Sequence, residues 1–303
     1  MIEAQHLTKR YGATTAVDDL SFRITPGQVT GFLGPNGAGK TTTMRMILGL
    51  DRPTGGSVTV NGRLYRDPAA PITEVGALLD AKAVHGGRSA RNHLRVIAAS
   101  NGLPESRVDE VLRIVGLHDV ASRRAGAYSL GMGQRLGIAA ALVGDPGILM
   151  FDEPVNGLDP EGIVWVRTLM RSLAAEGRTV LVSSHLMSEM ALTADHLIVI
   201  GKGRLIADAG VQEFLDRDSA LSVLVRSRDN ERLAQQITGA GGAVVPAVAG
   251  GLQVTGMASG TIGELALAAG IVVEELVPQR ASLEEVFMEM TKDSVEYSTG
   301  EVA

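Results

Sequence analysis

Short apolar runs alternate with amphipathic segments over the first two thirds of the chain. The runs that fit β-strands cover residues 29–33, 148–151, 179–183 and 196–200. Strands of this kind, separated by helical patterns, are typical of a mostly parallel sheet covered by helices. The pattern therefore predicts an α/β fold for this part of the chain.

One long stretch inside this region, about residues 89–142, carries helical patterns only. From Val108 onward, apolar residues recur at i, i+3, i+4 and i+7, and Pro104, a residue favoured at helix starts, precedes them. We interpret the apolar face as core packing. The stretch predicts a helical subdomain inserted into the α/β core.

The sequence changes character after about Asp218, where Gly and Ala runs separate short segments. In order, the segments predict strand 221–227, helix 229–238, strand 243–248, strand 252–255, helix 261–269 and strand 271–277. A β-α-β-β-α-β order is the ferredoxin-like arrangement. A final amphipathic helix is expected over 282–290, with a frayed tail from about Ser294. We therefore expect two domains, 1–217 and 218–303.

The composition of the chain limits the classes of partner that we expect and the cellular compartment in which we expect the protein. The 303 residues carry a net charge of -6 and only 3% aromatic side chains, so neither a basic surface nor stacking platforms favour nucleic acid, and we expect no such partner. The chain has no cysteine, which excludes disulfides and thiolate metal sites. The charged N-terminal segment is unlike a signal peptide, and no apolar run approaches the roughly 18 residues of a spanning helix. We expect a cytoplasmic protein that does not itself cross a membrane.

A G-x-x-x-x-G-K-[ST] motif follows the strand at 29–33 and precedes a helical run. It consists of Gly34, Pro35, Asn36, Gly37, Ala38, Gly39, Lys40 and Thr41, with a second hydroxyl at Thr42. In such a loop, backbone N–H groups surround phosphates, the lysine reaches the β- and γ-phosphates, and the threonine hydroxyl binds Mg²⁺. A purely structural glycine-rich turn is the alternative, but it leaves the lysine and the hydroxyls unexplained.

Two carboxylates, Asp152 and Glu153, end the apolar strand at 148–151. They are expected at the carboxyl edge of the sheet, where open α/β folds bind ligands. Asp152 is the candidate for holding Mg²⁺, and Glu153 is the candidate for accepting a proton from, or orienting, the attacking water. An acidic pair after a strand is often only a helix cap. Together with the phosphate loop, however, the pair predicts a nucleotide-hydrolysing site.

The segment from Tyr128 to Arg135, Tyr-Ser-Leu-Gly-Met-Gly-Gln-Arg, resembles the signature motif of ABC ATPases and lies just upstream of the Asp152 strand. With it, the resemblance covers residues 1 to about 210. It implies the P-loop NTPase fold of the ABC type, which has a mostly parallel core, an antiparallel β subdomain and a helical signature subdomain. It also implies ATP with Mg²⁺ as cofactors. Ser129 and Gly131 match the residues that cap the γ-phosphate held by a second copy, although an N-capped amphipathic helix would also explain Ser129.

Further residues match the same family. Asp159, in Asn-Gly-Leu-Asp, resembles the D-loop at the dimer interface, and His185 resembles the switch histidine that contacts the γ-phosphate. Tyr11 resembles the aromatic residue that stacks on adenine. The family therefore implies Glu153, His185 and Lys40 as catalytic residues.

Two positions depart from the family pattern. Asp80 stands where glutamine usually touches Mg²⁺ and the attacking water and relays the nucleotide state to the membrane partner. A carboxylate still ligates Mg²⁺, so Asp80 joins Thr41 and Asp152 as a metal-ligand candidate. Leu130 stands where the family usually has glycine. Both departures concern the rate of ATP turnover and its coupling to the membrane partner, and neither changes the expected fold.

The C-terminal segments Glu274–Leu276 and Ser282–Phe287 resemble the tail of ATPase subunits that serve ABC-2-type export permeases, including drug and antibiotic exporters. We therefore expect a peripheral subunit on the cytoplasmic face of the membrane. It powers export of a drug, an antibiotic or a lipid-like molecule through a separate permease. One chain has one phosphate loop and one signature, so a head-to-tail homodimer is expected.

Two alternatives belong to other classes. A soluble ABC ATPase that acts without transport usually has two ATPase modules in one chain, long coiled coils or zinc motifs, and none is present. A protein that senses or sequesters a drug would use the C-terminal domain as a binding module, whereas stabilisation of the dimer is the simpler interpretation of that domain.

Overall fold

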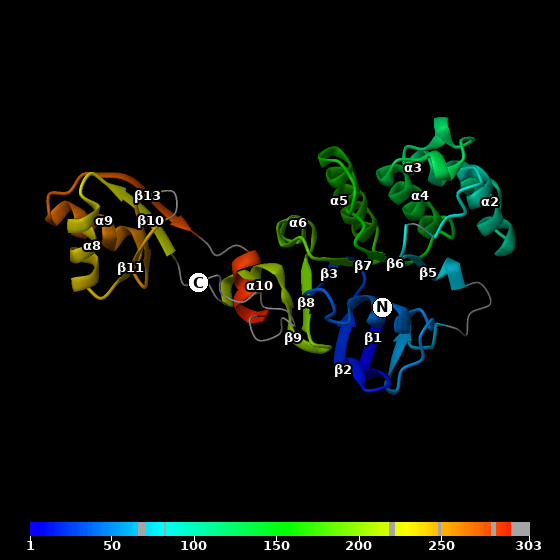
Figure 1. Cartoon of the computed structure of the whole chain (residues 1–303), viewed down its shortest axis with the longest axis horizontal. Helices are drawn as coiled ribbons and strands as arrows, with labels where there is room; N and C mark the ends of the chain where they lie inside the picture. The colour runs from blue at the N-terminus through cyan, green and yellow to red at the C-terminus, as the bar shows by residue number, and fades with distance from the viewer. Residues whose placement is uncertain (66–70, 82, 218–221, 248–249, 280–282, 292–303) are drawn as a thin grey trace. The chain divides into compact units, whose positions relative to one another are not determined.

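A computed structural model of the chain describes residues 1–65, 71–81, 83–217, 222–247, 250–279 and 283–291. These residues form two compact units, one of Met1–Val211, with Met290 and Thr291, and one of Gln212–Glu289 (Figure 1). The sequence placed the domain boundary between residues 217 and 218, and the two compact units divide between Val211 and Gln212. The tail expected from about Ser294 lies outside the described residues.

The first unit is built on a six-stranded sheet in the order β5-β6-β7-β3-β8-β9. Its strands are β3 (Val29–Leu33), β5 (Val75–Leu78), β6 (Ile148–Asp152), β7 (Thr179–Ser184), β8 (His196–Gly201) and β9 (Arg204–Gly210). All neighbours pair in parallel except β8 and β9. Strands β3, β6 and β7 are almost entirely buried, which explains why they read as unbroken apolar runs.

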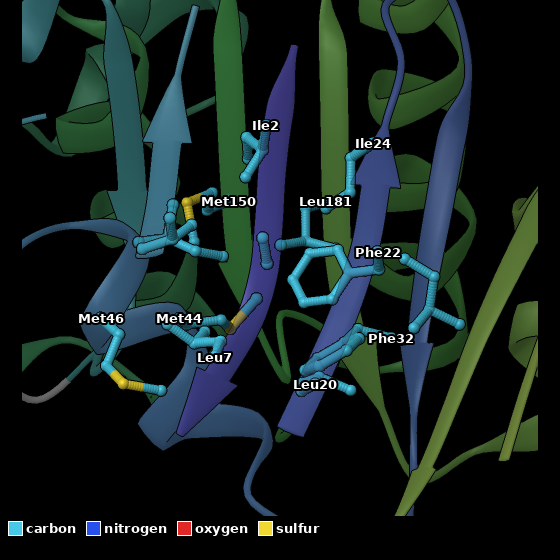
Figure 2. Close-up of a cluster of buried hydrophobic side chains, with 14 of the residues drawn as sticks. Ile2, Leu7, Leu20, Phe22, Ile24, Phe32, Met44, Met46, Met150 and Leu181 are labelled. Carbon is cyan, nitrogen blue, oxygen red and sulfur yellow. The ribbon is translucent and has the colours of Figure 1, made fainter. Parts of the chain in front are cut away.

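A second, antiparallel sheet has the order β2-β1-β4. It contains β1 (Ile2–Tyr11), β2 (Thr14–Ile24) and β4 (Gly55–Val60). Buried side chains of this sheet pack with residues of β3, β6, β7 and α1 in one hydrophobic cluster (Figure 2). Within this cluster, the rings of Phe22 and Phe32 lie 5.8 Å apart. This core fixes the position of the loop between β3 and α1.

Within the described residues, six α-helices belong to the first unit, and a seventh, α7, begins at its last residue before the second unit and continues into the second unit. They are α1 (Lys40–Ile47), α2 (Ala90–Ser100), α3 (Ser106–Ile114), α4 (Leu130–Leu142), α5 (Pro160–Ala175), α6 (Met187–Thr193) and α7 (Val211–Arg217). Helices α2, α3 and α4 form the helical subdomain predicted from the sequence (Figure 1). Val108, Val111 and Leu112 of α3 are buried, as their spacing predicted.

The second unit has the order β10 (Ser222–Ser227), α8 (Asn230–Gly239), β11 (Ala243–Pro246), β12 (Leu252–Thr255), α9 (Ser259–Ala268) and β13 (Val273–Gln279). The sheet order is β11-β12-β10-β13 with antiparallel pairs, which is the ferredoxin-like arrangement. Helix α10 (Leu283–Thr291) follows. Strand β13 begins two residues later than expected because Ile271 closes the turn after α9, where its N–H donates to Ala266 O.

Candidate nucleotide-binding site

The loop between β3 and α1 brings backbone N–H groups to the first turn of a helix. Gly39 lies just before α1 with φ 101°, a conformation that favours glycine. A Cβ atom at this position would lie 2.5 Å from Ala16 O, so the close approach of the two backbones also requires glycine. The free N–H groups and the dipole at this end of α1 favour an anion.

Lys40, the first residue of α1, is buried beneath the loop. Its ammonium donates to Gly34 O at 2.6 Å and to Pro35 O at 3.2 Å. Burial lowers the pKa of Lys40, whereas the carboxylates of Glu153 and Asp152 oppose that shift. A buried cation held by carbonyl oxygens is suited to a ligand that brings further negative charge.

Asp152 lies at the carboxyl end of β6 and is held from two sides. The Thr41 hydroxyl donates to Asp152 Oδ2 at 2.7 Å, and the Ser183 hydroxyl donates to Asp152 Oδ1. Ser183 stands opposite Asp152 in the parallel register of β6 and β7. The phosphate loop and the acidic strand therefore meet through one carboxylate.

Glu153 adopts φ 51°, an uncommon conformation for a residue other than glycine. Its N–H donates to the carbonyl oxygen of Ser183 at 3.2 Å and to Ser183 Oγ at 3.1 Å. Its Oε2 lies 2.8 Å from His185 Nδ1, and its carbonyl oxygen accepts a hydrogen bond from Gln134 Nε2 at 3.3 Å. These contacts hold the side chain beside His185 and close to Asp152.

A cavity of about 570 Å³ lies over these residues. Ten predicted residues line it: Asn36, Gly37, Ala38, Gly39, Lys40, Thr41, Thr42, Asp80, Asp152 and Glu153. Six further lining residues were not among the predicted site residues: Ala16, Leu79, Ala81, Leu130, Gln134 and Asn156. Residues of the 34–41 loop, the acidic pair and the signature segment of one chain thus surround a single space.

The oxygen atoms of Thr41 and Asp152 are hard ligands of the type that Mg²⁺ prefers, and Asp80 lines the same cavity. Within the described part of the chain, His, Asp and Glu side chains form no group of three that could hold a metal ion. Mg²⁺ is commonly bound by one or two carboxylates together with water and substrate phosphates. The donor set therefore fits this ion.

The remaining predicted residues make contacts elsewhere. Ser129 caps α4 by accepting from Met132 N at 3.2 Å, and Asp159 caps α5 by accepting from Gly162 N at 2.9 Å. A Cβ atom on Gly131 would lie 3.3 Å from the Leu158 side chain. Tyr11, 48% exposed on β1, donates through its hydroxyl to Asp51 at 2.9 Å. The motif residues of α4 and α5 thus have local structural contacts in the single chain.

Sequence reasoning did not assign roles to Ser183 and Gln134. Ser183 precedes the predicted switch histidine by two residues, but its contact with Asp152 depends on the register of two strands far apart in the sequence. Gln134 belongs to the signature segment and is buried, with its amide on Glu153 O. A buried amide in a helix would have been a signal for such a contact.

The fold and this site define a P-loop nucleoside-triphosphate-binding protein with a helical subdomain and an appended ferredoxin-like unit. Residues 17–156 match the family described as "ABC transporter". Residues 221–284 match a "Domain of unknown function (DUF8746)".

Two curated relatives are similar to this chain over 69% of its length. The bacitracin transport ATP-binding protein BcrA of Bacillus licheniformis is 41% identical over 211 residues, 69% of this chain and 69% of that protein. The lantibiotic transport ATP-binding protein SrtF of Streptococcus pyogenes is 37% identical over 210 residues, 69% of this chain and 90% of that protein. A solved structure of the ATP binding subunit of an ABC transporter has a TM-score of 0.66 and 27% identity, covering 72% of this chain and 92% of that one.

The chain belongs to the ABC transporter family of ATP-binding proteins, and it is an ATPase of the ABC type. The predictions of family, fold class and ATPase activity are confirmed. A dimeric bacterial ABC transporter cassette shares the fold, with a TM-score of 0.65 at 23% identity over 70% of this chain and 99% of that one. Among the described residues, none of the helices combines the length and hydropathy of a membrane-spanning segment.

Proposed function

We propose that this ATPase powers the export of a drug, an antibiotic or a lipid-like molecule through a separate membrane permease. The observation that carries the proposal is the cavity lined by Lys40, by the Thr41–Asp152 contact and by Glu153, whose carboxylate His185 contacts. The names of the relatives, which refer to transport of bacitracin and of a lantibiotic, favour a peptide antibiotic or a similar amphipathic molecule as cargo.

In the proposed hydrolysis, the phosphates of ATP lie against the loop of residues 34–41 and the ammonium of Lys40. Glu153 accepts a proton from the water that attacks the γ-phosphorus, and the bond from that phosphorus to the ADP oxygen breaks. His185, 2.8 Å from Glu153 Oε2, orients this carboxylate and contacts the γ-phosphate. Thr41, Asp152 and Asp80 are the proposed holders of Mg²⁺, which when bound neutralises charge on the β- and γ-phosphates.

The proposal requires two copies of the chain. Ser129 and Gly131 stand at the N-terminal end of α4, where free N–H groups and the helix dipole suit an anion. We propose that they cap the γ-phosphate bound to a second copy in a head-to-tail dimer. Asp159, by capping α5, shapes the loop at that interface. Tyr11, half-exposed on β1, remains the proposed adenine contact.

The partner is proposed to be a permease of the ABC-2 type, which would place the ATPase on the cytoplasmic face of the membrane as a peripheral subunit. Closure of the dimer on ATP and its opening after hydrolysis would then change the accessibility of the cargo site in the permease. Asp80, at the end of the β5 segment and in the cavity wall, is the proposed relay to the permease.

The test is Mg²⁺-dependent ATP hydrolysis by wild type and Glu153→Gln, each alone and reconstituted with the candidate permease in liposomes. A panel of amphipathic drugs is added to each sample. Hydrolysis that drugs stimulate only in the presence of the permease, and that Glu153→Gln abolishes, supports the exporter. Hydrolysis indifferent to both permease and drugs would favour a soluble ATPase without transport. Drug binding by the protein without the permease would favour the sensing alternative.

A further inference from the structure

The turn between α4 and β6 joins the signature helix to the acidic strand. Helix α4 begins after Ser129 and ends at Leu142, and β6 begins at Ile148 and ends at Asp152. Asp145 lies in the middle of this turn with φ 51°, and its N–H donates to Leu142 O at 3.0 Å. Aspartate and asparagine tolerate this conformation better than most residues. The turn thus sets the direction of α4 relative to β6.

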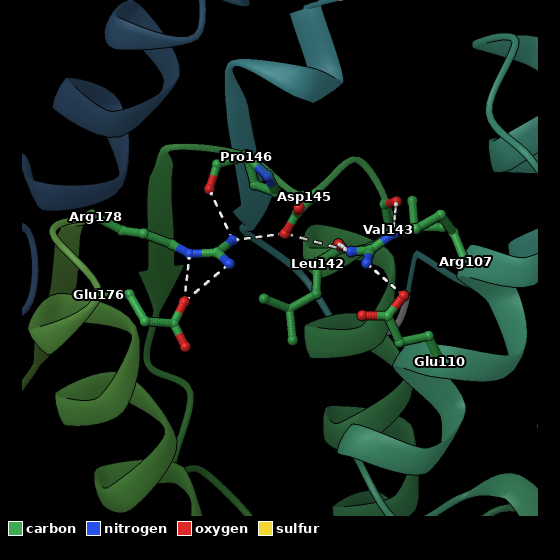
Figure 3. Close-up of polar contacts among 8 residues, drawn as sticks. All are labelled: Arg107, Glu110, Leu142, Val143, Asp145, Pro146, Glu176 and Arg178. Carbon is green, nitrogen blue, oxygen red and sulfur yellow. Dashed lines mark hydrogen bonds and ion pairs between the residues drawn. The ribbon is translucent and has the colours of Figure 1, made fainter.

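Arg178 attaches this turn to the neighbouring strand. Its Nη1 lies 2.9 Å from Asp145 Oδ1 and 3.2 Å from Pro146 O (Figure 3). Glu176 holds the other side of the guanidinium, with Oε2 at 2.9 Å from Nε. Arg178 directly precedes β7, the strand that carries Ser183. The turn is therefore tied to the strand that holds the Asp152 carboxylate.

Arg107 of α3 attaches the same turn to the end of α4. Its Nη2 donates to Leu142 O at 3.1 Å and its Nε donates to Val143 O at 3.3 Å. The same Nη2 lies 3.5 Å from Asp145 Oδ1, and Glu110 Oε2 lies 2.6 Å from Nη1 (Figure 3). A cation at the last carbonyl groups of a helix stabilises that end. Arg107 therefore joins α3, α4 and the turn.

One carboxylate oxygen, Asp145 Oδ1, thus lies between two guanidinium groups. The side chains of Arg107 and Arg178 are 18% and 22% exposed, whereas that of Asp145 is 58% exposed. Planar guanidinium groups held by several acceptors lose little further freedom when they bind a carboxylate. Removal of the carboxylate would leave Arg107 paired with Glu110 and Arg178 with Glu176, but it would remove the one acceptor that the two guanidinium groups share.

We propose that Asp145 is a positioning residue for ATP hydrolysis, which with Arg107 and Arg178 fixes the signature helix relative to the strands that carry Asp152 and Ser183. The network would affect the site within one chain and the contact between two copies. Within one chain, the network keeps Gln134 of α4 within 3.3 Å of Glu153 O. Across the dimer, it sets where Ser129 and Gly131 meet the partner's nucleotide, and this second consequence rests on the proposed function.

The test uses the full chain with Asp145→Asn and Asp145→Gly. Asparagine keeps the size and tolerates the left-handed backbone, and glycine relieves any backbone strain while removing the side chain entirely. Asp119→Asn is the matched control, because Asp119 is a fully exposed aspartate of the same helical subdomain. Three quantities are measured: kcat for ATP, the Kd for a fluorescent ADP analogue, and the emission of Trp165.

Trp165 is the only tryptophan of the chain and reports on the junction with α4. The guanidinium of Arg135, which lies on α4, stands 4.2 Å from the centre of the Trp165 ring on α5. The same guanidinium donates through Nη1 to Val115 O at the end of α3 at 3.1 Å. A shift of α4 relative to α5 would therefore change the surroundings of the indole.

We expect kcat to fall by about 10-fold to 100-fold in Asp145→Gly, as small displacements of reacting groups commonly cause, and by less in Asp145→Asn. The Kd for the ADP analogue should stay within about twofold, because the loop of residues 34–41 lies on other elements. Trp165 emission should shift in both variants, and Asp119→Asn should match wild type in all three measurements. Asp145→Gly with wild-type kcat and emission would overturn the proposal, as would a loss of ADP affinity equal to the loss of kcat.

The proposed dimer is tested separately, with wild-type protein only, by measuring kcat at several protein concentrations. A wild-type kcat that does not depend on protein concentration would contradict the head-to-tail dimer. The role of Asp145 within one chain would still be tested by the kcat, the Kd and the Trp165 emission of the variants.

Discussion

Replacement of Gly76 by alanine tests how closely β5 and α4 approach each other. A Cβ atom at Gly76 would collide with the carbonyl oxygen of Ala141, and it would lie 2.8 Å from the carbonyl carbon of that residue and 2.8 Å from Pro146 Cγ. Two of these atoms belong to the main chain of a helix that the core holds in place. Relief of the clash therefore requires β5 and α4 to separate, rather than a side chain to rotate.

Overpacking of a well-packed interior costs about 1–3 kcal/mol, and contact with rigid backbone favours the upper end of that range. With a urea m-value of about 2 kcal/mol/M, a loss of about 3 kcal/mol lowers the unfolding midpoint by about 1.5 M. Trp165 is the only tryptophan and lies in the first unit, so its fluorescence follows the unfolding of this unit. Unfolding in urea is therefore monitored by Trp165 emission.

Gly133→Ala is the matched control. Gly133 lies in α4, and a Cβ atom there would meet no atom within 4 Å. Alanine inside a helix is more stable than glycine by about 0.5–1 kcal/mol, so this variant should unfold at a slightly higher urea concentration than wild type. An unchanged midpoint for Gly76→Ala, or a decrease of equal size in both variants, would refute the account of this contact.

Three further predictions concern single side chains. Ser183→Ala removes a hydrogen bond to the Asp152 carboxylate, so the free energy of unfolding, monitored by Trp165 emission, should fall by about 1.5–3 kcal/mol. ATP hydrolysis by this variant should require a higher Mg²⁺ concentration than wild type, and an unchanged Mg²⁺ dependence would contradict this role. Asp159→Ala removes the N-cap of α5 and should cost about 1 kcal/mol in the same unfolding assay, whereas Asp159→Asn should cost much less. Burial and the Arg88 cation lower the pKa of His93 from its ordinary 6.5, so the unfolded chain binds this proton more readily. The contribution of neutral His93 to the free energy of unfolding should therefore be complete above pH 6.5 and should be lost as the pH falls towards the folded-state pKa. In thermal unfolding followed against pH, His93→Asn should show a smaller loss of stability on acidification than wild type.

The parallel core could be predicted closely from the sequence because its strands are buried on both faces. The run at 29–33 coincides with β3, and the runs predicted from Ile148, Thr179 and His196 begin at the first residues of β6, β7 and β8. Unbroken apolar runs leave few alternatives for such strands. The ferredoxin-like order of the second unit was predicted from short segments that Gly and Ala runs separate, and where the structure describes them the ends of its elements lie within two residues of the prediction.

The antiparallel sheet of β1, β2 and β4 was expected from the family resemblance and was not delimited from the residues. In strand β1 the buried residues Ile2 and Ala4 are two positions apart, but the next buried residue, Leu7, follows only after a register shift. Such interruptions weaken the period-2 pattern from which a strand is predicted.

The residues that line the cavity were named from the sequence where short contiguous motifs supply them, and they were missed where contacts between distant elements supply them. Ten of the predicted residues line the cavity. The contact of Ser183 with Asp152 depends on the register of β6 with β7, and that of Gln134 with Glu153 depends on the packing of α4. Neither tertiary relation can be derived from local spacing. Leu130 was seen as a departure from the family pattern, but its place in the cavity wall emerged only from the fold.

The most direct test of the central claim, that ATP joins two copies of this chain, is sedimentation of Glu153→Gln with MgATP and with MgADP. The proposed role of Glu153 predicts that the variant binds ATP without hydrolysing it, so MgATP should produce a stable dimer and MgADP should leave monomers. A second substitution, Ser129→Arg, should prevent the dimer without weakening the affinity for ATP. A monomer in saturating MgATP would contradict the account.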